Sequence, residues 1–181
     1  MVKYLASLTQ PPCGGDWSDV LAVELGCGTR PLGCLLAAQH GLHGVLLTDG
    51  NPAAVEYFVE GTIASARSSE QQWATAILGF RRLLWGDATD IEAVCHHVGH
   101  GINLVLACDV LYWPDSYTHF WETAAQLMSG HGCVLIAGRR RGGAEMDEVR
   151  MSAAHCCGWE RIQATLDDEE KFYIECFRYT A

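Results

Sequence analysis

The sequence lacks a long hydrophobic run. No stretch of its 181 residues reaches the roughly 18 consecutive apolar residues of a transmembrane helix. Residues 1–12 hold one lysine and only a few apolar residues before two prolines, which is too little for the apolar core of a secretory signal peptide. We therefore expect a cytoplasmic protein, also found in the nucleus, that does not span a membrane.

Cations are also scarce. The chain has 12 Lys and Arg residues against 22 Asp and Glu residues, which gives a formal net charge of −10. Such a chain repels the phosphate backbone of DNA and RNA, so nucleic acid is not an expected partner. The only run of cations in the sequence, Arg139-Arg140-Arg141, is expected to form a solvated turn.

Cysteine motifs are missing although cysteines are not. The nine cysteines form no Cys-x-x-Cys pair, and their odd number argues against a disulfide framework or a zinc ribbon. Most lie within apolar runs, where we expect them to pack as small buried hydrophobes. His96, His97 and His100 lie close together, but no carboxylate or thiol completes a recognisable ligand set, so no metal site is predicted.

Apolar residues are plentiful. Hydrophobic residues make up 49% of the chain and charged residues 19%, with a mean hydropathy of +0.06. This composition excludes intrinsic disorder. The length corresponds to a single domain, and we expect a monomer.

Short, continuously apolar segments alternate with segments of helical spacing. Helices are expected at 31–40, from Asn51-Pro52 onward, and at 90–98, 114–128 and 144–157. Strands are expected at 20–25, 44–48, 80–85, 102–107, 132–138, 161–165 and 172–179. This alternation predicts an α/β fold with a Rossmann-like, seven-stranded, mostly parallel sheet and helices on both faces. Because no helix separates the last two strands, they are expected to form a C-terminal antiparallel hairpin at one edge.

Acidic residues stand at or beside the ends of four expected strands. Glu24 precedes Gly26-Cys27-Gly28, Asp49 ends the second strand, Asp87 follows Trp85 and Asp109 ends the fourth. Ligands of open parallel sheets bind beyond the carboxyl ends of the strands. An unpaired carboxylate is costly to bury, so pure packing does not account for this pattern.

The pattern indicates a ligand that contains a nucleoside. Asp49 lies about 20 residues beyond the glycine loop, where a carboxylate accepts hydrogen bonds from ribose hydroxyls. Trp85 and Asp87 could flank an adenine. A nicotinamide cofactor would require a third glycine where Pro31 stands, so that fingerprint fails. S-adenosylmethionine has no phosphate, and its cationic ammonium suits an acid such as Glu24.

These residues resemble the seven-strand class I methyltransferases, and within them the family 16 protein-lysine methyltransferases. The resemblance covers roughly residues 20–180 and is most similar to the calmodulin-lysine and elongation-factor-lysine branches. It rests on Val23-Glu-Leu-Gly-Cys-Gly-Thr29, Leu46-Leu-Thr-Asp-Gly-Asn51, Leu84-Trp-Gly-Asp87 and Ala107-Cys-Asp-Val-Leu-Tyr112, together with Ala137-Gly-Arg-Arg140. Asp-x-x-Tyr at the end of the fourth strand is a signature of this family.

The resemblance implies an enzyme that transfers a methyl group from S-adenosylmethionine to a lysine of a protein substrate. Asp109 and Tyr112 would face the lysine and serve catalysis. The cofactor would contact Glu24, Gly26, Cys27, Gly28, Asp49, Gly50, Asn51, Trp85, Asp87 and Cys108.

Two departures from the family leave alternatives open. Arg30 stands where many members have a third glycine, and residues 1–19 are expected to be the remnant of a longer N-terminal segment before the core at 20–181 of the single domain 1–181. One alternative is a catalytically degenerate methyltransferase fold that binds a partner. Another is a methyltransferase acting on a small molecule, because the fold serves many substrates.

Overall fold

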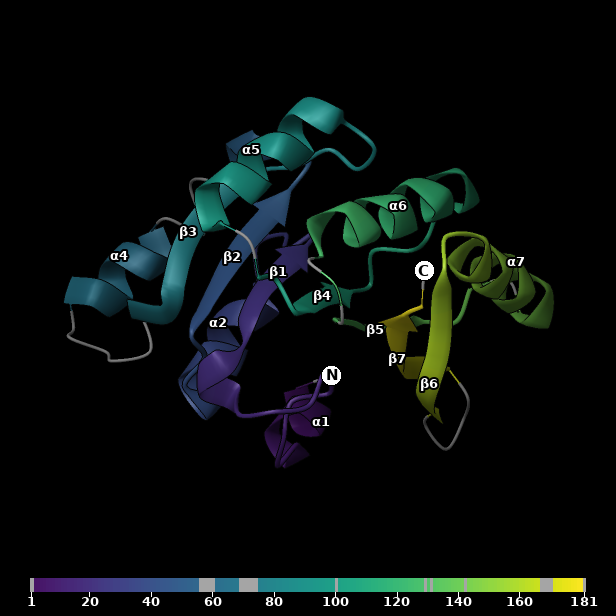
Figure 1. The fold of residues 1–181 in the computed structure, drawn as a ribbon, viewed down its shortest axis with the longest axis horizontal. Coiled ribbons are helices and arrows are strands. Elements are labelled where there is room, and N and C mark those ends of the chain that lie inside the picture. The colour runs from purple at the N-terminus through teal and green to yellow at the C-terminus, as the bar shows by residue number, and fades with distance from the viewer. Residues whose placement is uncertain are drawn as a thin grey trace.

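A computed structural model describes residues 2–55, 61–68, 75–99, 101–128, 130, 132–141, 143–166 and 171–180. Their strands form a seven-stranded sheet in the order β3-β2-β1-β4-β5-β7-β6 (Figure 1). All neighbouring pairs are parallel except β5–β7 and β6–β7, as the sequence predicted. The strands are β1 Leu21–Leu25, β2 Gly44–Asp49, β3 Ile77–Arg82, β4 Leu104–Cys108, β5 Cys133–Arg139, β6 Trp159–Leu166 and β7 Phe172–Tyr179.

Helices cover both faces of the sheet (Figure 1). On one face, α5 Ala88–Val98, α6 Tyr117–Leu127 and α7 Gly143–Cys156 pack on a core cluster built around Phe120, Trp121 and Phe177. On the other face lie α1 Val2–Ser7, α2 Leu32–His40 and α4 Gly61–Ser68. The remaining short helices are η1 Trp17–Asp19, α3 Pro52–Val55 and η4 Pro114–Ser116. Within the described part of the chain, no helix has the length and apolarity needed to cross a bilayer.

The N-terminal residues pack on the core. Leu5 of α1 is fully buried in the second cluster, and the ring of His40 hydrogen-bonds the Leu5 carbonyl oxygen at 2.9 Å. Trp17 stacks on the same histidine, with 4.2 Å between the ring centroids. Residues 2–19 therefore contribute to the folded unit that contains the sheet.

The third strand lies earlier in the chain than its predicted position, 80–85. It spans Ile77–Arg82, because the chain turns after Leu83: the Leu84 amide donates to the Asp90 carboxylate and the Asp87 amide donates to the Leu84 carbonyl. The apolar run therefore ends in a turn. The other six strands, β6 included, agree with their predicted positions to within two residues at either end.

Helix α2 packs unusually close to the sheet. A Cβ atom added to Gly33 would lie 2.7 Å from Val45 Cγ2 and 2.9 Å from Leu47 Cδ2. Both contacts are with side chains of β2 that are fully buried, so they can move away only by displacing other core atoms. Gly33 thus supplies the close approach of helix and strand that a third glycine provides in dinucleotide-binding loops, two residues later in the chain.

We predict that Gly33→Ala lowers the free energy of unfolding by about 1–3 kcal/mol, because the methyl group overpacks the α2–β2 contact. Urea denaturation of the purified protein measures this. The matched control is Gly61→Ala at the start of α4, where an added Cβ meets no atom within 4 Å. Equal stability of the two variants would contradict the packing argument.

Candidate functional site

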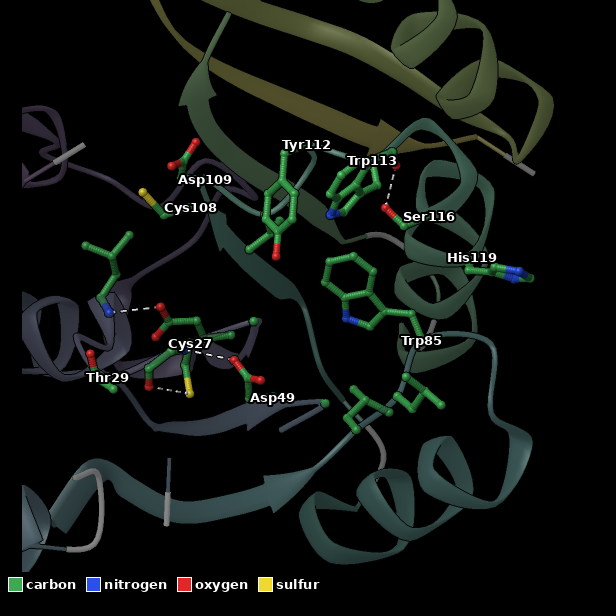
Figure 2. A pocket seen from close by; sticks show the side chains of 18 of the residues that line it. Cys27, Thr29, Asp49, Trp85, Cys108, Asp109, Tyr112, Trp113, Ser116 and His119 are labelled. Atoms are coloured by element: carbon green, nitrogen blue, oxygen red, sulfur yellow. Dashed lines mark hydrogen bonds between the residues drawn. The ribbon is translucent and has the colours of Figure 1, made fainter. Parts of the chain in front are cut away.

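A cavity of about 990 Å³ opens at the carboxyl ends of β1, β2 and β4 (Figure 2). The register places Leu25, Thr48 and Ala107 side by side, so the loops that follow these strands meet at one edge of the sheet. The wall is formed by Glu24, Gly26, Cys27, Gly28, Thr29, Arg30, Leu32, Asp49, Gly50, Leu83, Leu84, Trp85, Cys108, Asp109, Val110, Tyr112, Trp113, Asp115, Ser116 and His119.

The glycine loop after β1 forms the floor of this cavity. Gly26 has a φ of 71°, and a Cβ there would lie 2.7 Å from Val110 Cγ1. Only glycine tolerates both this positive φ and the close approach of Val110 without strain. Burial and the Glu24 and Asp49 carboxylates raise the pKa of the Cys27 thiol well above its usual range, so this cysteine is neutral and is not a nucleophile.

Glu24 joins β1 to the start of α2. Its two carboxylate oxygens accept the Leu32 amide at 2.9 Å and the Gly33 amide at 2.7 Å. Pro31 occupies the N-cap and its side chain accepts no hydrogen bond. Glu24 therefore accepts the hydrogen bonds of helix amides that a capping side chain would otherwise accept. Burial raises the pKa of Glu24 to about 7, against these two hydrogen bonds.

Asp49 is held at the end of β2 by the backbone on both sides. One carboxylate oxygen accepts the Gly28 amide at 3.0 Å and the other accepts the Asn51 amide at 2.9 Å. Each oxygen keeps a lone pair for a further donor. The carboxylate is thus fixed in the cavity wall and can accept two hydroxyl groups from a ligand.

Aromatic side chains form the opposite wall. Trp85 packs edge-on against Phe120, with ring centroids 5.1 Å apart, and its indole borders the cavity (Figure 2). Tyr112 and Trp113 follow β4 and are 51% and 68% exposed. Exposed aromatic rings beside carboxylates suit a planar or cationic ligand.

Asp109 follows β4 in a strained conformation and pairs with an arginine. Its φ of 56° is the only positive value for a non-glycine residue in the described part of the chain. Arg141 contacts both carboxylate oxygens at 2.9 Å and lies 5.6 Å from the centroid of the Tyr112 ring. Arg140 in turn pairs with Asp147 at 2.7 Å. The expectation of a turn at 139–141 is wrong for Arg139, which is the last residue of β5, whereas the side chains of Arg139 and Arg141 are exposed as expected.

Most of the residues selected from the sequence meet at this cavity. Ten of the twelve line it: Glu24, Gly26, Cys27, Gly28, Asp49, Gly50, Trp85, Cys108, Asp109 and Tyr112. Asn51 and Asp87 do not. The Asp87 carboxylate caps α5 by accepting the Asp90 amide at 3.0 Å, so a contact of Asp87 with a ligand stays a prediction.

The start of α6 and the turn before it also contribute to the cavity, which the sequence pattern did not indicate. Asp115, Ser116 and His119 line the cavity although no strand ends beside them in the chain. Ser116 and His119 are three residues apart across the start of α6, which places them on one side of that helix. The sequence pattern used above does not point to them, because they follow neither a strand end nor a glycine in the chain.

The cavity is acidic. Glu24, Asp49, Asp109 and Asp115 contribute carboxyl groups, whereas Arg30 is the one arginine or lysine among the described residues that line it. Within the described ranges, no cluster of His, Cys, Asp and Glu side chains has the arrangement of a metal site. Such a cavity favours a ligand that carries positive charge over one that carries phosphate groups.

Solved structures with a similar fold include several methyltransferases. An O-methyltransferase family protein from Burkholderia thailandensis superimposes with a TM-score of 0.71 at 12% identity, over 100% of this chain and 55% of that protein. Fibrillarin from Aeropyrum pernix, solved with natively bound S-adenosyl-L-methionine, superimposes with a TM-score of 0.63 at 17% identity, over 97% of this chain and 72% of that protein. At these identities the likeness establishes the fold.

Sequence comparison identifies the family. The protein N-lysine methyltransferase METTL21A of Danio rerio is 28% identical over 126 residues, which are 70% of this chain and 52% of that protein. The chain thus spans about half the length of this curated relative. Residues 1–154 match the lysine methyltransferase family. The sheet order and the glycine loop of this chain are consistent with that match, which covers most of the chain. The chain therefore belongs to the lysine methyltransferase family.

Proposed function

We propose that this protein transfers a methyl group from S-adenosylmethionine to the side-chain amine of a lysine in a protein substrate. One observation carries the proposal: a single acidic cavity contains Asp49 beside the glycine loop, and Asp109 and Tyr112 on its other side. The first group of residues suits a nucleoside cofactor, and the second suits a lysine amine. Family membership supports the same reaction.

The residues present fit the cofactor. The Asp49 carboxylate has free lone pairs for two ribose hydroxyls, and the indole of Trp85 offers a face for the adenine. Glu24 offers a carboxylate to the ammonium of the methionine end. When bound, this cofactor supplies an electrophilic methyl group on a sulfonium cation, and the excess of carboxylates in the cavity favours that charge.

The residues after β4 would hold the acceptor amine. Asp109 attracts the lysine ammonium, the Tyr112 hydroxyl can hydrogen-bond the amine, and the aromatic rings hold a methylated cation. The amine loses one proton to solvent before it attacks. The nitrogen–methyl bond then forms as the sulfur–methyl bond breaks, and S-adenosylhomocysteine leaves. Correct positioning of amine and methyl group supplies much of the rate acceleration.

Partner and location follow as proposals from charge and composition. A net charge of −10 favours a basic segment of a protein over a nucleic acid as substrate. We propose that the enzyme acts as a monomer in the cytoplasm or nucleus, where lysine-bearing partners are present and thiols such as the nine of this chain stay reduced.

We predict that Asp49→Asn abolishes most of the thermal stabilisation by S-adenosylhomocysteine. A ligand at 100 times its dissociation constant adds about 2.7 kcal/mol, which raises the Tm of a domain of this size by roughly 5–10 °C. The variant should lose this shift at the same ligand concentration, because the amide is a weaker acceptor for ribose hydroxyls. The control is Asp16→Asn, an exposed aspartate outside the cavity whose side chain caps nothing. A full shift in Asp49→Asn would contradict the assignment.

We predict that affinity for S-adenosylhomocysteine falls about tenfold from pH 8 to pH 6. With its pKa raised to about 7, Glu24 is ionised above that pH and protonated below it, and only the ionised form attracts the ligand ammonium. Calorimetric titration in two buffers of different ionisation enthalpy should show release of close to one proton at pH 6. Glu24→Gln should bind more weakly, with a flat pH profile and no proton release. An unchanged pH profile in that variant would place the titrating group elsewhere.

We predict that Asp109→Asn lowers methyl transfer about a hundredfold while it leaves S-adenosylhomocysteine binding intact. Asparagine tolerates the left-handed conformation of this position, so the fold is retained, whereas alanine would add backbone strain. Incorporation of tritiated methyl groups into lysines of a protein extract measures the transfer. Tyr112→Phe, which keeps the ring, should lose less. Full activity of Asp109→Asn would remove Asp109 from the acceptor side.

A further inference from the structure

Arg141 touches both of the side chains that the proposed function assigns to the acceptor lysine. Its guanidinium contacts the two carboxylate oxygens of Asp109 at 2.9 Å each and lies 5.6 Å from the Tyr112 ring centroid. A carboxylate and an aromatic face are the two groups that would bind a lysine ammonium. A cation from the protein's own chain therefore occupies the position expected for the substrate cation.

This pairing is specific although it lies at the surface. The arginine presents its planar fork to a single carboxylate, which is the strong geometry for such a pair. The backbone of Asp109 is fixed as well, because its amide donates to the Ala137 carbonyl at 2.7 Å while its φ is 56°. The side chains of Arg141 and Asp109 are 42% and 50% exposed, so the pair is only weakly stabilising and can open.

We propose that Arg141 is a specificity-determining residue of the acceptor site: its guanidinium holds Asp109 and Tyr112 until a substrate lysine displaces it. This inference rests on the proposed function. An acceptor needs further contacts with the protein to displace the arginine, because an isolated amine gains Asp109 only at the expense of an existing pair. The competition thus favours a lysine that other contacts of its protein hold at the cavity over free amines.

The test uses two analogues of S-adenosylhomocysteine in which a tertiary nitrogen replaces the sulfur. One carries a methyl group on that nitrogen and the other a 2-aminoethyl arm, whose ammonium reaches the acceptor position. The ratio of their dissociation constants isolates the contribution of the ammonium. Isothermal titration at pH 8 with wild type, Arg141→Gln, Asp109→Asn and the double variant completes a double-mutant cycle.

We expect the arm to improve affinity about threefold to fivefold more in Arg141→Gln than in wild type, the size of an exposed ion pair. In the Asp109→Asn background, Arg141→Gln should change the ratio of the two dissociation constants by less than half of that threefold to fivefold effect. Arg141→Lys, which keeps the charge but loses the fork, should lie between wild type and Arg141→Gln. The control for net charge is Arg178→Gln, an exposed arginine that pairs in the sheet with Cys133 at the opposite end of β5. It should leave the ratio unchanged.

Two results would overturn the inference. An unchanged ratio in Arg141→Gln would show that the arginine does not compete for the acceptor position. An equal increase in the Asp109→Asn background would show a general effect of charge instead of release of Asp109. A failure of the methyl-bearing analogue to bind any variant is a different outcome: it would overturn the proposed function itself and this inference with it.

Discussion

The buried carboxylate of Glu24 is the contact on which the arrangement of the cavity depends. It fixes the first turn of α2 against β1, and the hydroxyl of Thr48 donates to the Glu24 carbonyl oxygen at 2.7 Å from the neighbouring strand. The glycine loop lies between these attachments and carries the Gly28 amide to Asp49. Two acids thus hold the loop in place. Glu24 caps the helix that follows the loop, and Asp49 accepts a hydrogen bond from the loop itself.

Electrostatics decides what such a cavity can hold. Burial raises the pKa of Glu24 to about 7, so this carboxyl group is partly protonated at neutral pH, and a bound cation would favour its ionised form. The same excess of carboxylates disfavours a pyrophosphate, which matches the missing third glycine of a dinucleotide loop. The acid at the end of β4 stands outside the buried part of the cavity and meets Arg141. The protein therefore has two acids in different settings. Glu24 is buried and would meet the ammonium of a ligand, whereas Asp109 is exposed and pairs with the protein's own Arg141.

Features that depend on residues close together in the chain could be predicted from the sequence. The apolar runs located the parallel strands, and the carboxyl ends of parallel strands must meet at one edge, so Glu24, Asp49 and Asp109 could be placed together from the sequence. The error in β3 arose because the apolar run Leu83-Leu84-Trp85 suits a strand as well as a cavity wall. Hydrophobicity alone does not distinguish these two environments.

Contacts between distant segments could not be predicted in this way. Arg141 and Asp109 are 32 positions apart in the sequence, and their pairing depends on the adjacency of β4 and β5 and on the strained backbone of Asp109. Likewise, the need for glycine at position 33 arises from the side chains of β2 beneath it. Both features are visible only once the sheet order and register are known.

A crystal structure of the protein with S-adenosylhomocysteine tests the central claim most directly. We expect the ribose hydroxyls to bind Asp49, the homocysteine ammonium to lie against Glu24, and the sulfur to face the side of the cavity bearing Asp109 and Tyr112. A nucleoside bound away from Asp49, or a sulfur directed away from Asp109, would contradict the assignment of cofactor and acceptor sides to this cavity.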